Sequence, residues 1–187
     1  MSDRARCLPP IVASDARILI LGSMPGRASL AARQYYAHPR NAFWPIMGRL
    51  LGFDVAQDYL TRVEALSGAG VAVWDVLDSC HRPGSLDSAI DERSLVVNDL
   101  AGFLAGHRAI KRVFFNGSAA ARLFDRHLGA ILNVTGLQLT RLPSTSPAHA
   151  ALTFAQKLAA WRVVAVDPGF QPNFSGVPSN SSGRRLP

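Results

Sequence analysis

The sequence predicts an α/β fold, in which three α/β/α layers are built around a central, four-stranded, mostly parallel sheet. The first observation is that short apolar runs, such as RILILG (17–22), alternate with stretches whose apolar residues recur at helical spacing. The second is that 187 residues, 48% of them hydrophobic and 18% charged, suffice for one domain with a core. Strands that alternate with helices usually form a parallel sheet covered on both faces.

Each expected element follows from its local pattern. Asn98 and Pro147 are expected at the starts of two helices, and Gly129 just past the end of another. The stretch 79–94 has no clear period and is expected to be a long ordered loop. The expected strands are 17–22, 71–77, 111–117 and 137–143, and the expected helices are 41–52, 58–70 (ending at Gly68), 98–107, 118–129 and 147–164.

The composition changes near residue 167. The last stretch, 167–187, is rich in Pro, Gly, Ser and Asn, which offers little to bury, so we expect a disordered tail there. Residues 1–166 are then expected to form a single domain.

Composition also excludes several classes of protein. No apolar run is long enough to span a membrane, and no apolar segment of a signal peptide follows the N-terminal charges. The two cysteines, Cys7 and Cys80, cannot form a disulfide framework, and cysteines alone are too few for a zinc site or an iron–sulfur cluster. We therefore expect a cytoplasmic protein with no membrane contact.

The net charge of +7 comes from 20 Lys and Arg against 13 Asp and Glu. Lysine occurs only twice, at Lys111 and Lys157, so most of the positive charge is arginine, whose planar fork suits phosphate. The excess favours either a polyanionic partner or a solvated basic surface.

The chemistry is expected at the carboxyl ends of the strands, where open parallel sheets bind ligands. Four segments should meet there: GSMPG (22–26), the loop after VWD (73–75), NGSAA (116–120) and LPSTSPAH (142–149). GSMPG is neither a dinucleotide-binding nor a P-loop motif, and its serine is misplaced for a nucleophile elbow.

Two other kinds of site can be assembled on paper. Ser144, His149 and Asp75 could form a hydrolase triad, although such sets are easily found by chance. The spacing of His38, His81 and Asp75 matches no common set of metal ligands, so we expect no metal.

The segment QYYAHPRNAFW (34–44) concentrates aromatic and polar residues after the first strand. Phe43 and Trp44 are expected in the core, whereas Tyr35 or Tyr36 could stack on a nucleobase. Asn41 is suitable as a helix N-cap. The serines of LPSTSPAH could hold a phosphate at a helix N-terminus, cap that helix, or do both.

Taken in order, these segments resemble the uracil-DNA glycosylase superfamily over residues 17–162. The set GSMPG, YYAHPRNAFW, WDVLDSC followed by GSLDSAI, and FFNGSAAA is most similar to its hypoxanthine-DNA (deoxyinosine) glycosylase branch. Many branches carry an Asp or Asn within the first motif to position the attacking water, but here that place holds Met24. The resemblance implies that Asn41 takes over this role and that the GSMPG loop acts through its backbone.

The resemblance implies a DNA repair hydrolase that removes a deaminated base, most simply hypoxanthine, from double-stranded DNA, as a monomer and without a cofactor. Asp75 stands at the base-reading place of the superfamily, where its carboxylate could accept the N1–H of hypoxanthine; capping the following loop is the other interpretation. Asn41 is the expected catalytic residue; the expected base-binding residues are Gly22, Ser23, Met24, Pro25, Gly26, Tyr35, Tyr36, Asp75 and Asn116; and the expected DNA-binding residues are His38, Arg40, Ser144, Thr145, Ser146 and His149.

Lys111 and Lys157 are both expected away from the ligand-binding edge, which predicts a monofunctional enzyme with no Schiff-base lyase activity. Activity on uracil or on mismatched bases is the alternative within the same family. A non-catalytic nucleic-acid-binding α/β domain would account equally well for the charge and the aromatic residues.

Overall fold

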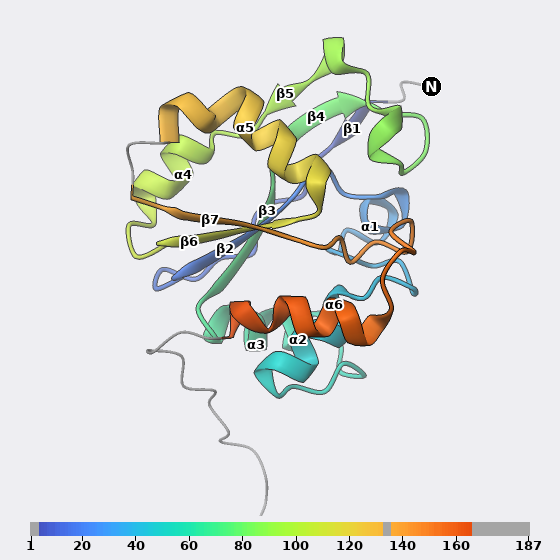
Figure 1. Cartoon of the computed structure of the whole chain (residues 1–187), viewed down its shortest axis with the longest axis vertical. Coiled ribbons are helices and arrows are strands. Elements are labelled where there is room, and N and C mark those ends of the chain that lie inside the picture. Colours follow the sequence, from blue (N-terminus) through green and yellow to red (C-terminus); the bar gives the residue numbers. More distant parts are fainter. Residues whose placement is uncertain (1–3, 133–135, 166–187) are drawn as a thin grey trace, which may run out of the picture.

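The computed structural model describes residues 4–132 and 136–165. Its central sheet has the strand order β3-β2-β6-β7, and every neighbouring pair is parallel (Figure 1). The inner strand β2 is buried along its whole length, which explains its purely apolar run. The expected four-stranded sheet is confirmed, with strands β2 (Ile18–Gly22), β3 (Val71–Asp75), β6 (Arg112–Asn116) and β7 (Gln138–Leu142).

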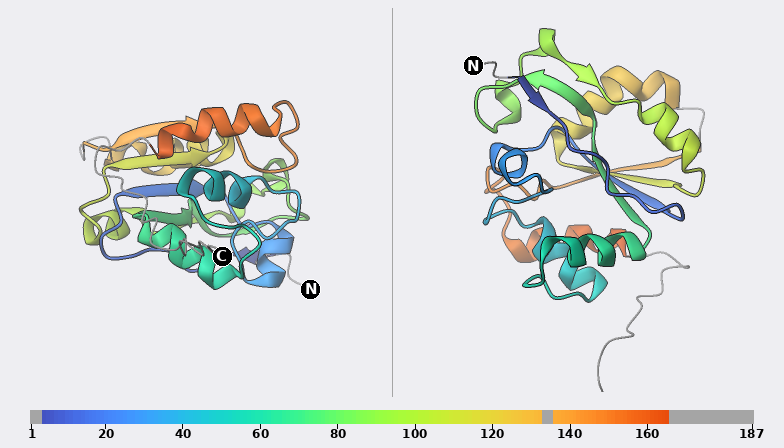
Figure 2. Two further views of the ribbon diagram at one scale, coloured as in Figure 1. Left: turned by 90° about the horizontal axis from the view of Figure 1, so that it is seen from below. Right: turned by 180° about the vertical axis from the view of Figure 1, so that it is seen from behind.

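Helices cover both faces of this sheet, as Figures 1 and 2 show. Alternate residues of β2 point to opposite faces: Ile18 and Ile20 pack in one apolar cluster with Phe43, whereas Leu19 and Leu21 pack in another with Phe124. The expected three-layer architecture is therefore confirmed. The first cluster lies under α2 (Phe43–Leu51), α3 (Tyr59–Gly68) and α6 (Phe154–Trp161), and the second under α4 (Leu100–Gly106) and α5 (Ser118–Leu132).

The expectation of a single loop over 79–94 is wrong. This stretch begins in the strand β4 (Leu77–His81), which pairs antiparallel with β1 (Arg4–Arg6) and β5 (Val96–Val97) in a second, three-stranded sheet. Two 3-10 turns, η1 (Asp87–Ala89) and η2 (Glu92–Ser94), follow β4. The pairing joins residues more than 70 positions apart, so no local period could show it.

The closing helix also begins later than expected. Ser146 N–H donates to Ser144 Oγ and Ala148 N–H donates to Ser146 Oγ, so these serines close local turns instead of starting a helix. Helix α6 begins at Phe154, after a capping box between Thr153 and Gln156, and a 3-10 turn (Arg162–Val164) follows it.

Three smaller differences concern other helices. Asp99, and not Asn98, caps α4, because its carboxylate accepts the N–H of Gly102. Helix α5 continues past Gly129, which a helix interior tolerates at a cost of about 1 kcal/mol, to Leu132. The short helix α1 (Arg27–Ala32), directly after GSMPG, has no counterpart among the expected elements.

Within the described ranges, no helix is long and apolar enough to cross a membrane. The tail expected over 167–187, with the domain boundary at 166, lies outside the described residues and stays a prediction.

Candidate functional site

A cavity of about 440 Å³ opens at the carboxyl edge of the central sheet. Its size lies within the range of small-molecule sites. Every predicted site residue lines it except His149. The structure therefore brings together the four segments that the topology placed at this edge and residues of QYYAHPRNAFW (34–44), and it adds Ser85–Asp87 and Arg27–Ser29.

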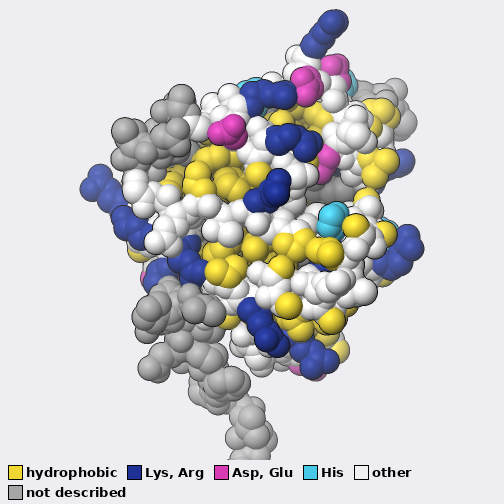
Figure 3. Space-filling view, in the orientation of Figure 1, with side chains coloured by type: hydrophobic (Ala, Val, Ile, Leu, Met, Phe, Trp, Pro, Cys, Tyr) yellow, Lys and Arg dark blue, Asp and Glu magenta, His cyan; other side chains and the backbone are white. Residues whose placement is uncertain are grey.

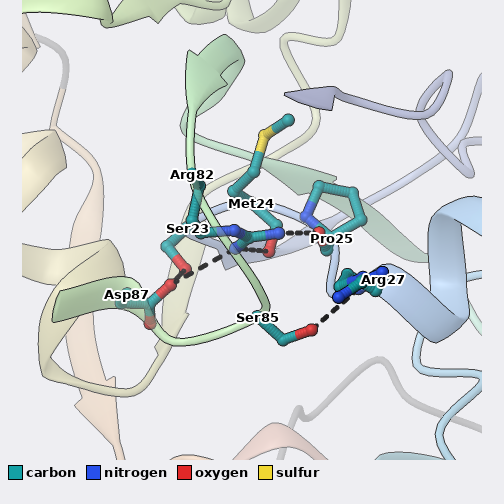
Figure 4. A network of polar contacts seen from close by, with 7 residues as sticks. All are labelled: Ser23, Met24, Pro25, Arg27, Arg82, Ser85 and Asp87. Carbon is teal, nitrogen blue, oxygen red and sulfur yellow. Dashed lines mark hydrogen bonds and ion pairs between the residues drawn. The ribbon is translucent and has the colours of Figure 1, made fainter. Parts of the chain in front are cut away.

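The GSMPG loop (22–26) turns its carbonyl groups away from this cavity. The carbonyls of Gly22 and Ser23 accept the N–H groups of Val76 and Leu77, at 2.9 and 3.1 Å. Those of the next two residues accept hydrogen bonds from the buried Arg82: Nη1 donates to Met24 O at 3.3 Å, and Nη2 donates to Pro25 O (Figure 4).

The N–H groups of the loop consequently face the other way. In a trans peptide the N–H points opposite to the carbonyl before it, and the described chain has no cis bond. The N–H groups of Ser23, Met24 and Gly26 donate no hydrogen bond within the described residues, and all three residues line the cavity. The loop thus offers the cavity a set of free donors, which suits an acceptor or a developing negative charge.

A polar network with the segment after β4 holds this loop in place (Figure 4). Asp87 accepts a hydrogen bond from Ser23 Oγ at 2.7 Å and lies 3.9 Å from Arg82 Nη1. Ser85 Oγ accepts the N–H of Arg27 at 3.0 Å. The segment after β4 is thereby fixed against both ends of the GSMPG loop.

The side chain of Met24 takes no part in the cavity's polar chemistry. It is 5% exposed and packs in a small apolar cluster with Leu77 and Cys80. The position that resembles the water-positioning place of other family branches is therefore apolar here.

Asp75 lies at the inner end of the cavity and is 3% exposed. Burial raises the pKa of its carboxyl to about 7; Cys7 and Arg82 act to lower this pKa, and Asp87 acts to raise it. No backbone N–H donates to this carboxylate within the described residues, so the loop-capping interpretation of Asp75 has no support. The site thus contains a carboxyl group that changes charge near neutral pH.

The close approach of Asp75 explains the first glycine of the loop. A Cβ atom on Gly22 would lie 2.2 Å from Asp75 Oδ1. Only glycine fits while the carboxyl keeps this place.

Two residues hold Asp75 from behind. Asn98 Nδ2 donates to Asp75 O at 2.9 Å, and the Cys7 thiol lies 3.7 Å from Asp75 Oδ2. Burial raises the pKa of Cys7 to about 12, so the group remains a thiol. Asn98, expected as a helix cap, is instead a buried support of the site.

Asn41 stands at the start of α2 and lines the cavity. Its Oδ1 accepts the N–H of Phe43 at 3.0 Å, and its own N–H donates to His38 O at 2.8 Å. The N-cap position of α2 is Ala42, so the expectation that Asn41 is the N-cap is wrong: its side chain closes a turn just before the helix and is oriented by it. Its Nδ2 group makes no hydrogen bond within the described residues, which leaves a donor free at the cavity.

The two tyrosines differ in their surroundings. Tyr35 is 3% exposed, donates its hydroxyl to Leu8 O at 3.0 Å and belongs to the core, although it reaches the cavity wall. Tyr36 is only partly buried, and its ring stacks on Phe43 with centroids 3.9 Å apart. Burial raises the pKa of Tyr36, whose hydroxyl finds no hydrogen-bond partner among the described residues. Phe43 and Trp44 are buried, as expected.

Another part of the cavity lining comes from the ends of two strands and the loops that follow them. Asn116 forms a double hydrogen bond with Thr145: Nδ2 donates to Oγ1 and the backbone N–H of Thr145 donates to Oδ1, both at 2.8 Å. Gly117 has a φ of +101°, and a Cβ there would lie 2.9 Å from Ser144 Cβ. These contacts fix the loop after β7 against the loop after β6.

The expected helix N-terminus at this loop is absent, because α6 begins only at Phe154. The phosphate-binding role expected of Ser144 and Ser146 therefore has no helical N–H groups behind it. Lys157 is closer to the site than expected, since its Nζ donates to Ser146 O at 3.3 Å. It is 5% exposed and does not line the cavity.

Sequence reasoning gave no site role to Arg82, Cys7 or the segment Ser85–Asp87, although this segment lies within GSLDSAI, one of the motifs of the resemblance. Arg82 directly follows β4, and the N–H of Cys7 donates to Asp78 O of β4. Only the long-range pairing of β1 with β4 places these two residues at the site. Within this segment, Leu86 is 56% exposed at the rim.

The described residues form neither the hydrolase triad nor the metal site considered in the sequence analysis. Ser144 Oγ accepts the N–H of Ser146 and makes no hydrogen bond with His149 in the described chain. Across residues 4–132 and 136–165, no group of three or more His, Cys, Asp or Glu could hold a metal ion.

Comparison with known proteins shows which family the chain belongs to. Two proteins named hypoxanthine DNA glycosylase are similar in sequence: one from Methanosarcina barkeri is 34% identical over 75% of this chain and 85% of its own, and one from Methanosarcina acetivorans is 32% identical over 77% and 87%. A solution NMR structure of a Methanosarcina acetivorans protein, whose description places it with the uracil DNA glycosylases, has a TM-score of 0.71 and 28% identity and covers 86% of this chain and 98% of its own. The model of the uracil DNA glycosylase superfamily matches residues 9–165, and we conclude that the chain belongs to this superfamily of DNA glycosylases.

Proposed function

We propose that this enzyme hydrolyses the N-glycosidic bond of deoxyinosine in double-stranded DNA and releases hypoxanthine. The observation that carries the proposal is the convergence of three features on one cavity: the free N–H groups of the GSMPG loop, the titratable Asp75 and the oriented amide of Asn41. The names of the similar Methanosarcina proteins support the same substrate.

Recognition of the base follows from Asp75. Hypoxanthine carries a proton on N1 that adenine lacks, and an ionised Asp75 can accept it. The extruded purine enters the cavity, and its ring stacks against Tyr36, which Phe43 supports from the far side. Adenine would place an acceptor against the carboxylate, so it is rejected.

Bond cleavage needs a positioned water and donors to the departing base. Asn41 orients the water, whose oxygen forms the new bond to C1′ of the sugar. The C1′–N9 bond breaks, its electron pair leaves with the purine, and the water proton passes to solvent. The N–H groups of Ser23, Met24 and Gly26 are suited to stabilise the negative charge that develops on the base.

Contacts to the DNA backbone are assigned to the polar rim. His38, Arg40, Ser144 and Ser146 all line the cavity, and the N–H of Ala42 donates to Thr145 O at 3.0 Å, which joins the two segments. Lys and Arg are spread over the face seen in Figure 3, and Asp and Glu are sparser there. We further propose that the enzyme acts as a monomer without a cofactor, because one chain supplies every residue given a role.

A panel of duplexes tests the substrate. Single-turnover release of free base is measured on matched duplexes that carry hypoxanthine, uracil, xanthine or mismatched thymine, with adenine as the control. We expect the fastest release from the hypoxanthine duplex and none from the adenine duplex. Faster release of uracil or thymine would contradict the proposed specificity. Binding of every duplex without release of any base would indicate a non-catalytic nucleic-acid-binding domain instead.

Asn41→Ala tests the water-positioning role. We expect release of hypoxanthine to fall by about 10²-fold or more, the scale of losing one positioned catalytic group, while duplex affinity changes little. Loss of the bond to Phe43 N–H should also cost about 1 kcal/mol of stability.

Asn41→Ser separates the two roles of this side chain. A serine hydroxyl can also accept the N–H of Phe43 in a turn of this kind, so stability should stay near that of the wild type. The same hydroxyl is too short to reach the water, so release should remain as slow as in Asn41→Ala. An Asn41→Ser enzyme with full activity would refute the catalytic assignment.

Asp75→Asn tests the titration of the buried carboxyl. Because the ionised form binds N1–H, the wild-type rate should rise with pH through about 7, whereas the Asn variant should show no such rise. If the base-release rate of Asp75→Asn keeps the same rise with pH, the rise comes from another group and the assignment to Asp75 is wrong.

The same titration affects stability. The pKa of Asp75 is higher in the folded than in the unfolded chain, so ionisation destabilises the wild type as pH rises through about 7. Asp75→Asn should therefore be more stable than the wild type at pH 8, with a gap that shrinks toward pH 4, as thermal unfolding would show.

The enzyme is proposed to be monofunctional. A lyase needs an amine that reaches the sugar, but Lys157 is buried against Ser146 O, and Lys111 lies at the amino end of β6. Treatment with borohydride during turnover should trap no covalent protein–DNA adduct. An adduct that disappears in Lys157→Met would show that the amine swings into the site.

A further inference from the structure

A second cavity, of about 300 Å³, adjoins the base pocket on the outer side of the GSMPG loop. Arg27 lines both cavities. Arg82 lines only the second cavity. Its guanidinium nevertheless binds the carbonyls of Met24 and Pro25, two residues that line the first cavity. Arg27 and the guanidinium of Arg82 thus connect the lining of the two cavities, and Figure 4 shows both side chains beside the loop.

Three arginines from separate parts of the chain meet at the second cavity. Arg4 comes from β1, Arg27 from the start of α1, and Arg82 from the residue after β4. The remaining lining residues are Ala5, Leu30, Pro83 and Gly84, so no carboxylate is among them. Concentrating like charges in this way is unfavourable unless an anion offsets it.

The three guanidinium groups are poorly neutralised. Arg4 donates to Ser79 Oγ at 2.9 Å and forms no ion pair within the described residues, and neither does Arg27. The side chain of Arg82 is 1% exposed; Asp87, 3.9 Å away, lies on the base-pocket side, and Arg82 Nε has no hydrogen-bond partner in the described chain. The cavity therefore combines a buried cation with two unpaired, accessible arginines.

We propose that this cavity binds a backbone phosphate of the DNA strand, next to the nucleotide whose base enters the main pocket. Arginine forks match the geometry of phosphate oxygens, and a phosphodiester carries one negative charge where three positive charges converge. The proposal rests on the proposed function in its choice of ligand. It assigns Arg4 and Arg27 to DNA binding, a role given to neither by the sequence.

The salt dependence of duplex binding tests the site. Fluorescence anisotropy is measured on an undamaged duplex over a series of salt concentrations, for the wild type and for Arg4→Ala/Arg27→Ala. Each phosphate contact contributes about 0.9 to the slope of log affinity against log salt, so the double variant should lose about that much. An unchanged slope would overturn the proposal.

Two controls separate the site from general loss of charge or fold. Arg108 is exposed between α4 and β6, at the opposite edge of the sheet, and Arg108→Ala should leave the slope within error of the wild type. Arg4→Lys/Arg27→Lys keeps both charges and should restore most of the slope. An equal loss of slope in Arg108→Ala would show that the arginines act only through net charge, which would also overturn the site.

Free phosphate is the other source of the same chemistry. Thermal unfolding is compared in inorganic phosphate and in chloride at equal ionic strength, without DNA. Stabilisation by phosphate that the double variant loses, together with an unchanged DNA slope, would identify a site for free phosphate and refute the DNA contact. Because an undamaged duplex needs no base release, failure of the lesion panel and failure of this site are distinguishable.

Discussion

The active-site geometry depends above all on one buried guanidinium. Arg82 binds the carbonyls of Met24 and Pro25, and the backbone N–H groups of Val76 and Leu77 bind the two carbonyls before them. Four successive carbonyls are thus drawn to one side, and the planar peptide sends the N–H groups to the other. Burying an arginine costs several kcal/mol of desolvation, which the two carbonyls and the nearby Asp87 offset in part. The buried arginine thereby fixes a row of backbone N–H donors in one orientation before any ligand binds.

The surroundings of Asp75 shift the pKa of its carboxyl in opposite directions. A buried carboxyl resists ionisation, and its neighbour Asp87 adds to that resistance. Arg82 and the thiol of Cys7 act in the other direction, so the group stands near the point where its charge changes at neutral pH. Gly22 allows the carboxyl to lie directly over the loop, where a Cβ would collide with it. Under the proposed function, Asp75 would accept the N1–H of the base with a charge that no close ion pair already neutralises.

Local patterns were sufficient for the sheet, for the core helices and for the edge at which the site forms. The apolar runs of β2, β3 and β6 and the helical spacing around Phe43 are short-range signals, and strand order places their ends together. The support of the site could not be read in this way. Arg82 and Cys7 are brought to Met24 and Asp75 by the pairing of β1 with β4, which joins distant parts of the chain. The start of α6 was misplaced because Ser144 and Ser146 have the side chains of a helix cap but close turns instead.

The placement of Met24 and Asn41 then has a common physical explanation. The side chain of Met24 is directed to the apolar cluster with Leu77 and Cys80, because the carbonyls of its loop are fixed by Arg82 and the strand end. A carboxylate or amide at position 24 would have to enter that dry cluster, where it would lack a partner. Asn41 stands on a different element, and its orientation is set by Phe43 N–H at the start of α2. Under the proposed function, Asn41 would orient the water and the GSMPG loop would stabilise the charge of the base, so the two tasks would be divided between two separately fixed segments.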